Sequence, residues 1–163
     1  MRAAITGHLV LSTIHTNDAL STIERLRDIG VPNYLIASAL NGVISQRLVR
    51  RICPECRESY HPSTEELREL GIHDGEHHHF YHGTGCPNCF NTGYRGRMAV
   101  FEILTIGHDL RAAIGRGAGR DELQHIIEKQ GGFVPLAENC RRRVLEGATT
   151  IEEVRRVVSS VDY

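Results

Sequence analysis

The chain has 163 residues, 40% of them apolar and 24% charged, and a formal net charge of −1. This length allows one domain or two to three small ones, and the near-neutral charge gives no global field that would attract nucleic acid or a membrane surface. The sequence shows no signal peptide and no apolar run long enough to cross a bilayer, which disfavours an integral membrane protein.

The N-terminal third has the pattern of a strand followed by a helix. Residues 9–14 are apolar and β-branched, which predicts a strand covered on both faces. Apolar residues then recur at helical spacing over 20–29, and Gly30 ends the predicted helix. In open α/β sheets ligands bind beyond the carboxyl ends of strands, and a helix N-terminus there favours anions. Three polar side chains occupy that position: His15, Thr16 and Asn17.

The rest of the chain predicts mainly helices. Residues 43–52 fit a strand, which we favour, or a continued helix, and a second strand is expected over 97–104. Capping boxes at 63–66 and 149–152 predict the starts of two helices. The remaining helical patterns cover 34–40, 109–114, 121–130 and 136–145.

Two Cys-x-x-Cys pairs, Cys53/Cys56 and Cys86/Cys89, are separated by 29 residues. This is the ligand pattern of a structural Zn²⁺ site, in which four thiolates complete a tetrahedron and leave no position open for chemistry. Two redox dithiols or a disulfide framework would be the alternatives. Neither accounts for two matched pairs, each with an internal proline, and this cysteine usage suits a reducing cytoplasm. The fifth cysteine, Cys140, is expected to be a buried free thiol.

Two further clusters allow more than one interpretation. Five histidines lie within 72–82 and could be spare metal ligands, but we favour a solvated loop because four cysteines already complete a site. Similarly, the three arginines 141–143 fit an exposed helix face better than a phosphate site.

A P-loop requires the pattern Gly-x-x-x-x-Gly-Lys-Ser/Thr, in which the lysine reaches the phosphates of a nucleotide. Lys129 is the only lysine of the chain, and it lies at the end of a helical pattern outside any such loop. These 163 residues therefore contain no phosphate-binding loop of that kind.

Four stretches resemble the type II secretion and type IV pilus assembly ATPases. Residues 6–19, Thr-Gly-His-Leu-Val-Leu-Ser-Thr-Ile-His-Thr-Asn-Asp-Ala, resemble the histidine box of that family. Residues 46–56 are similar to the link from its RecA-like core into its tetracysteine subdomain, and 93–102 are similar to the exit from that subdomain. Residues 147–154 are similar to its final helix.

The resemblance implies an α/β fold in three parts. Residues 1–52 would be the C-terminal part of a RecA-like ATPase core with a parallel sheet. Residues 53–97 would form the zinc subdomain, and 98–163 a return strand and a helical subdomain. The cysteines favour the secretion and pilus-extension branch, since the retraction motors of the family lack them.

The resemblance also implies a cytoplasmic homo-hexamer that uses ATP and Mg²⁺ and acts on an inner-membrane platform protein, with peripheral membrane association and no nucleic acid. His15 would lie near the γ-phosphate or the attacking water, and Thr16, Asn17 and Arg47 would contact or sense the nucleotide. His8 is a second candidate, placed farther away. For both histidines the alternative is a ring nitrogen that donates to a backbone carbonyl.

The family's P-loop, aspartate box and Walker B carboxylate all precede its histidine box, so the resemblance places this chain in the C-terminal part of such an ATPase. It could come from a truncated gene, an excised piece or an incomplete reading frame, and we expect no ATP hydrolysis by the chain alone. The alternatives are a free-standing zinc-stapled interaction domain and a nucleic-acid-binding zinc ribbon. Neutral charge and the absence of Trp disfavour the ribbon.

Overall fold

The computed structural model describes residues 1–72 and 78–159. They divide into two compact units, which we call unit 1 (Met1–Ser45 and Phe101–Pro135) and unit 2 (Gln46–Val100 and Leu136–Tyr163). The long strands β1 (Gly42–Ile52) and β4 (Tyr94–Thr105) each contribute residues to both units. The three-part division expected from the sequence stays a prediction.

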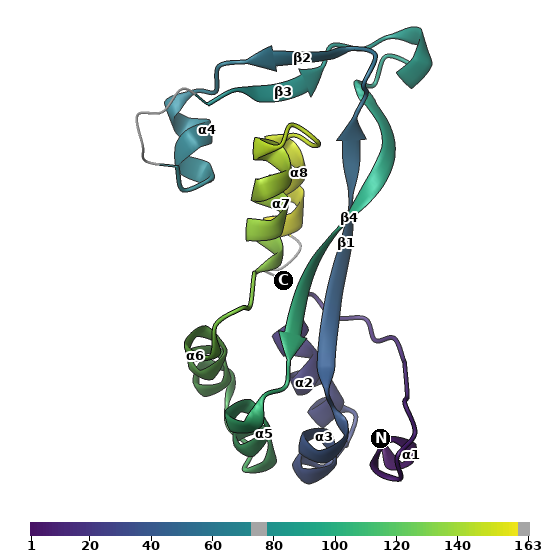
Figure 1. Cartoon of the computed structure of the whole chain (residues 1–163), viewed down its shortest axis with the longest axis vertical. Coiled ribbons are helices and arrows are strands. Elements are labelled where there is room, and N and C mark those ends of the chain that lie inside the picture. Colours follow the sequence, from purple (N-terminus) through teal and green to yellow (C-terminus); the bar gives the residue numbers. More distant parts are fainter. Residues whose placement is uncertain (73–77, 160–163) are drawn as a thin grey trace. The chain divides into compact units, whose positions relative to one another are not determined.

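Unit 1 is built around helices. Its buried core includes Ile23, Ile36, Leu110 and Leu123, which come from four different helices. Because each helix buries one apolar stripe against the others, the helical periodicity of the sequence is the main determinant of this core. The helices are α1 (Arg2–Ile5), α2 (Ala19–Asp28), α3 (Asn33–Ala39), α5 (His108–Gly115) and α6 (Arg120–Gln130) (Figure 1).

Local signals fix both ends of α2. The side chain of Asp18 accepts a hydrogen bond of 2.6 Å from the backbone N–H of Ser21, which satisfies one of the unpaired donors of the first turn. At the other end Gly30 adopts a φ of +86°, a conformation that glycine takes without a steric penalty. The predicted helix over 20–29 is therefore confirmed.

The predicted strand over 9–14 is wrong. No strand is assigned to this segment, and its side chains are exposed, with Leu9 at 86% and Leu11 at 87%. A strand needs a neighbour that exchanges backbone hydrogen bonds with it. Among the described residues, β1 pairs with β4, and β2 (Arg57–Tyr60) pairs with β3 (Phe80–Gly83), so none of these strands pairs with this segment.

Unit 2 combines a short hairpin with helices. Strands β2 (Arg57–Tyr60) and β3 (Phe80–Gly83) pair antiparallel, with Arg57 opposite Gly83 and Tyr60 opposite Phe80. The helices of unit 2 are α4 (Thr64–Glu69), η1 (Pro87–Cys89, a 3₁₀ turn), α7 (Leu136–Leu145) and α8 (Ile151–Ser159). Helices α7 and α8 lie side by side (Figure 1), and their core residues include Leu136, Cys140 and Val154.

Strands β1 and β4 run antiparallel. The residue after β4, Ile106, donates its N–H to the carbonyl of Asn41 just before β1 at 3.0 Å. The residue after β1, Cys53, donates to the carbonyl of Gly93 just before β4 at 2.9 Å. Residues 43–52 are therefore a strand, as favoured from the sequence, and the continued helix is excluded.

One capping box is confirmed and the other is not. Ser63 and Glu66 exchange side-chain to backbone hydrogen bonds at the start of α4. In contrast, α8 begins one residue later than expected, at Ile151, and the hydroxyl of Thr149 donates to the carbonyl of Arg50 at 2.7 Å. A tertiary hydrogen bond has therefore replaced the local one.

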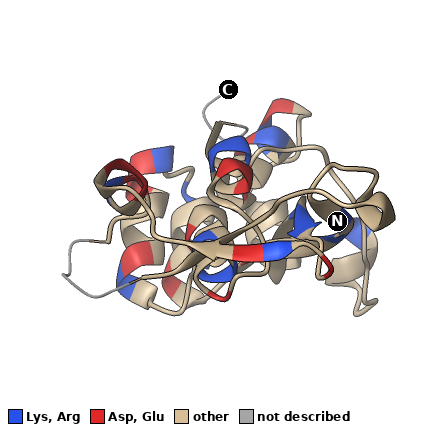
Figure 2. Cartoon of the chain, turned by 90° about the horizontal axis from the view of Figure 1, so that it is seen from above, with Lys and Arg blue, Asp and Glu red and all other residues tan. Residues whose placement is uncertain are grey.

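Basic and acidic residues lie close to one another along the helices, as the blue and red segments of the ribbon in Figure 2 show. On α7, for example, Arg141 and Arg142 both pair with Glu138, and Arg143 pairs with Glu146. The predicted exposed face at 141–143 holds only in part, because Arg142 is exposed whereas Arg141 and Arg143 are half-buried and Arg141 donates to the carbonyl of Leu70. In the part of the chain that the structure describes, no helix has the length and apolar character needed to span a membrane.

Candidate metal centre

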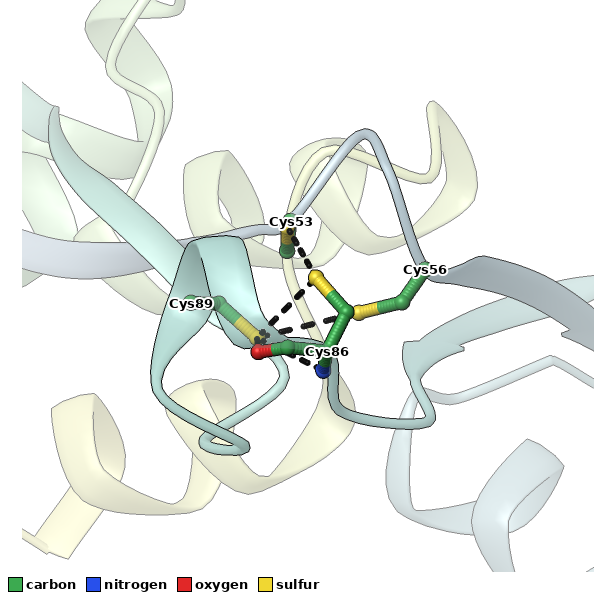
Figure 3. A group of neighbouring side chains, drawn as sticks. All are labelled: Cys53, Cys56, Cys86 and Cys89. Carbon is green, nitrogen blue, oxygen red and sulfur yellow. Dashed lines mark hydrogen bonds between the residues drawn. The ribbon is translucent and has the colours of Figure 1, made fainter.

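The four cysteines of the two Cys-x-x-Cys pairs converge in unit 2. Cys53 and Cys56 lie in the turn that follows β1. Cys86 immediately precedes the 3₁₀ turn η1, and Cys89 is its last residue (Figure 3). Their four sulfur atoms all lie within 4.8 Å of one another. Thus the structure brings together four side chains that are up to 36 residues apart in sequence.

The distances between these sulfur atoms fit a tetrahedral metal ion. The separations are 3.8 Å for Cys53–Cys86, 3.9 Å for Cys56–Cys89 and 3.7 Å for Cys86–Cys89. A tetrahedron with metal–sulfur bonds of about 2.3 Å requires sulfur atoms about 3.8 Å apart, whereas a disulfide requires about 2.0 Å. All four thiols are free, so the disulfide alternative is not supported and the cluster could hold a metal ion.

Backbone amides point at the sulfur atoms. The N–H groups of Cys86 and Gly93 each donate to Sγ of Cys89 at 3.3 Å. Burial raises the pKa of Cys89, but these hydrogen bonds outweigh it and lower the pKa to about 6. Burial raises the pKa of Cys56 and of Cys86 above the usual thiol value. A thiolate at Cys89 is therefore favoured by the fold itself, and a bound cation would favour the others.

Two glycines allow the chain segments of the cluster to approach closely. A Cβ atom at Gly93 would overlap the carbonyl oxygen of Gly83, and a Cβ atom at Gly83 would overlap the backbone of Gly93. Gly93 also has a φ of +75°, which disfavours any other residue. The second cysteine knuckle can therefore lie against the end of β3 only with glycine at both positions.

An ion pair between buried Glu153 and partly exposed Arg50 connects α8 with β1, close to the cluster in sequence. The carboxylate of Glu153, which is 3% exposed, accepts the backbone N–H of Arg50 at 2.8 Å and pairs with its guanidinium at 2.7 Å. The guanidinium also lies 3.9 Å from the ring centre of Tyr94 at the start of β4. Burial raises the pKa of Glu153, but these contacts with Arg50 hold it below the ordinary value.

None of the residues predicted to sense nucleotide belongs to the cysteine cluster. His15 is exposed and belongs to unit 1, together with Thr16, whose hydroxyl lies 2.9 Å from that of Thr22, and half-buried Asn17. His8 is exposed, with Nδ1 3.2 Å from the carbonyl oxygen of Ala3. Arg47 lies on β1 in unit 2. His15, Thr16 and Asn17 are close to one another because they are consecutive in sequence.

Sequence reasoning missed two buried carboxylates, Glu102 and Glu153. Glu102 is 5% exposed and accepts the backbone N–H of Ala19, the first residue of α2, at 2.5 Å. The one available signal was an acidic residue at a buried position of an alternating strand, since Val100 and Leu104 are also buried. Of the histidine-rich loop, His73 and His77 lie outside the described residues.

Comparison with known proteins gives consistent matches. A family model described as type II/IV secretion system protein matches residues 1–156. The type IV pilus assembly ATPase PilB of Thermus thermophilus is 44% identical over 154 residues, which are 93% of this chain and 17% of that protein. The putative type II secretion system protein E of Escherichia coli K12 is 40% identical over 160 residues, or 98% of this chain and 32% of that protein.

Among solved structures, the pilus retraction motor PilT with bound ADP has a similar fold. Its TM-score is 0.59 at 23% identity, over 96% of this chain and 34% of that one. This chain spans between 17% and 34% of the length of these three proteins.

Proposed function

Because the chain belongs to the type II/IV secretion system protein family, we propose that it forms the C-terminal part of an ATPase that drives the assembly of pilins or pseudopilins. The match over residues 1–156 is the observation that carries this proposal. The whole ATPase would be a hexamer in the cytoplasm, held at the inner membrane through a platform protein. Its P-loop and Walker B carboxylate would come from chain outside these 163 residues.

The cysteine cluster would hold one structural Zn²⁺. Four thiolates at tetrahedral spacing are the ligand set that zinc prefers in structural sites, and they leave no position for substrate. The ion would join the turn after β1 to the knuckle around η1, so its role would be to hold unit 2 in shape. The Cys86 and Gly93 amides would offset part of the negative charge on the thiolates.

In the whole ATPase, His15 would contact the γ-phosphate or the attacking water, and Thr16, Asn17 and Arg47 would contribute to nucleotide binding. Two anchors hold the segment that carries His15. Asp18 caps α2, and the buried carboxylate of Glu102 binds the N–H of Ala19. The exposed apolar side chains of 9–14 would be covered by the remainder of the ATPase core.

A chimera tests the proposed function. The type II secretion system protein E of Pseudomonas aeruginosa is 39% identical to this chain over 157 residues, which are 31% of that protein. We expect that replacing its matching segment with this chain, in a strain lacking the native protein, restores secretion to the same order as the native protein. A parallel chimera with the type IV pilus assembly ATPase TfpB of Acinetobacter baylyi, 41% identical over 161 residues, tests the pilus system.

The matched control is the same chimera with all four cluster cysteines replaced by serine, which should fail to restore secretion. If both chimeras accumulate as stable protein yet neither restores function, the proposal is wrong. If the chimera functions equally well with and without the four cysteines, the structural metal is not needed for function and that part of the proposal is wrong. The isolated chain should hydrolyse no ATP, measured as phosphate release.

A further inference from the structure

A histidine lies next to each strand at the end of the β2–β3 pair where the intervening chain connects the two strands: His61 follows β2 and His79 precedes β3. Extending the observed register by one residue beyond Tyr60 and Phe80 places His61 directly opposite His79. Their imidazole rings lie close together, with centres 4.6 Å apart and planes at 46°. Both side chains are exposed, so an ion from solvent can reach them.

We propose that His61 and His79 form a second metal site, which binds one divalent transition ion of the Ni²⁺, Cu²⁺ or Zn²⁺ class. Two imidazoles bound at about 2.1 Å to one ion, with ligand angles of 90–109°, have ring centres roughly 4.5–5.3 Å apart. The observed 4.6 Å lies within this range. Imidazole nitrogen suits these ions, and water completes the coordination.

The site is distinct from the cysteine cluster. Cys56 immediately precedes β2 and Thr84 follows β3, so the cluster adjoins one end of the hairpin, whereas the histidines lie at the other end. Five residues of extended chain separate Cys56 from His61, or roughly 16 Å at the rise of a strand. One ion therefore cannot be shared between the two groups.

Binding at this pair has a structural consequence. His61 and His79 are the two ends of the chain segment that contains α4 and the buried residues Leu70 and Ile72. An ion that both histidines bind only in the folded chain, where the strand register brings them together, stabilises the folded state by its binding free energy. Added Ni²⁺ therefore raises the melting temperature of the zinc-loaded protein.

The pair can be tested by titrating Ni²⁺ into protein whose cysteine cluster has first been loaded with Zn²⁺. Calorimetry is expected to show one Ni²⁺ bound per chain. His61→Gln and His79→Gln each weaken this binding by about 10–100-fold or more, as expected when one of two protein ligands is lost. His82→Gln is the matched control, because His82 is exposed on the same hairpin but on the opposite face.

Two results would overturn the site: no Ni²⁺ bound by the zinc-loaded protein, or equal affinity in His61→Gln. A second measurement uses Zn²⁺ and the imidazole ¹⁵N resonances, in which the ring nitrogens of His61 and His79 should shift together. Shifts confined to other histidines would assign the ion elsewhere and overturn the pair. Because both side chains are exposed, zinc-loaded His61→Gln and His79→Gln without added Ni²⁺ should melt at the same temperature as the zinc-loaded parent protein without added Ni²⁺.

Discussion

Cys89 has two roles in the cluster, because its sulfur is both a candidate metal ligand and the acceptor of two backbone hydrogen bonds. Two backbone N–H groups donate to its sulfur, so Cys89→Ser replaces both the thiolate ligand and the anionic acceptor of these bonds with a neutral, shorter hydroxyl. We expect metal content to fall from one ion per chain to near zero, measured by elemental mass spectrometry after dialysis.

Cys140→Ala is the control for this substitution. Cys140 is equally buried but packs in the apolar core of unit 2, and burial raises the pKa of its thiol to about 12, so it has no tendency to form a thiolate. The control should keep its metal and lose only core stability. Metal loss in the control, or metal retained in Cys89→Ser, would contradict this assignment of ligands.

At Glu153 a single substitution separates the effect of charge from that of shape. Glu153→Gln keeps the volume but removes the charge that Arg50 binds through both its backbone and its guanidinium. Hydrogen bonds to charged groups contribute about 1.5–3 kcal/mol, so we expect the free energy of unfolding at pH 7 to fall by about that amount. Urea denaturation of the metal-loaded proteins measures it.

The pH dependence of this effect has a defined sign. The folded-state pKa of Glu153 is held below its ordinary value of 4.5, so the ionised carboxylate stabilises the fold fully above that value. The stabilisation is lost as the pH falls through the lower, folded-state pKa. The difference between parent and variant should therefore shrink below about pH 4.5. Taking this difference cancels the loss of metal in acid, which affects both proteins, and a constant difference would show that Glu153 acts through its shape alone.

At the scale of elements, the close backbone approach between the end of β3 and the second cysteine knuckle depends on glycine. Gly93→Ala would place a Cβ atom against the carbonyl oxygen of Gly83, and it should displace the knuckle and weaken metal binding. Gly96→Ala is a close control, because Gly96, three residues farther along the chain and on β4, also has a positive φ, +78°, but has open space around its Cβ position.

The control should therefore show only the cost of the backbone conformation, roughly 1 kcal/mol. Competition with a chromophoric zinc chelator measures the affinity of each variant. Equal affinities for Gly93→Ala and Gly96→Ala would show that the close approach at Gly83 is not required for metal binding.

The elements that the sequence predicted correctly are those with strong local signals. Helix α2 has an apolar stripe, a capping aspartate and a terminating glycine, all within thirteen residues, and the cysteine pairs specify their chemistry by spacing alone.

Strands β2 and β3 were missed because each has only four residues, too few to show a period. The segment 9–14 was wrongly predicted because apolar content alone does not supply a strand partner. The partners of Glu102 and Glu153 lie 83 and 103 residues away in sequence, beyond any local pattern.

At the scale of the whole molecule, the two units have separate sources of stability. The core of unit 1 is formed by residues of helices α2, α3, α5 and α6 with apolar residues near them, and it includes none of the cysteines. Unit 2 has its own apolar core and the cysteine cluster beside it. Small units with limited cores commonly depend on a metal or a disulfide for folding.

Removal of the metal should therefore act unevenly on the molecule. With a strong chelator present, we expect backbone amides of β2, β3 and the knuckle around η1 to lose most of their protection from hydrogen exchange, because the bound ion would hold these turns together. Amides of α2 and α5 should keep theirs, since their core residues belong to unit 1. Hydrogen exchange with mass spectrometry resolves these segments, and adding back one equivalent of Zn²⁺ is the control that should restore protection. Equal loss across both units would mean that they unfold as one cooperative body, joined through the shared strands β1 and β4.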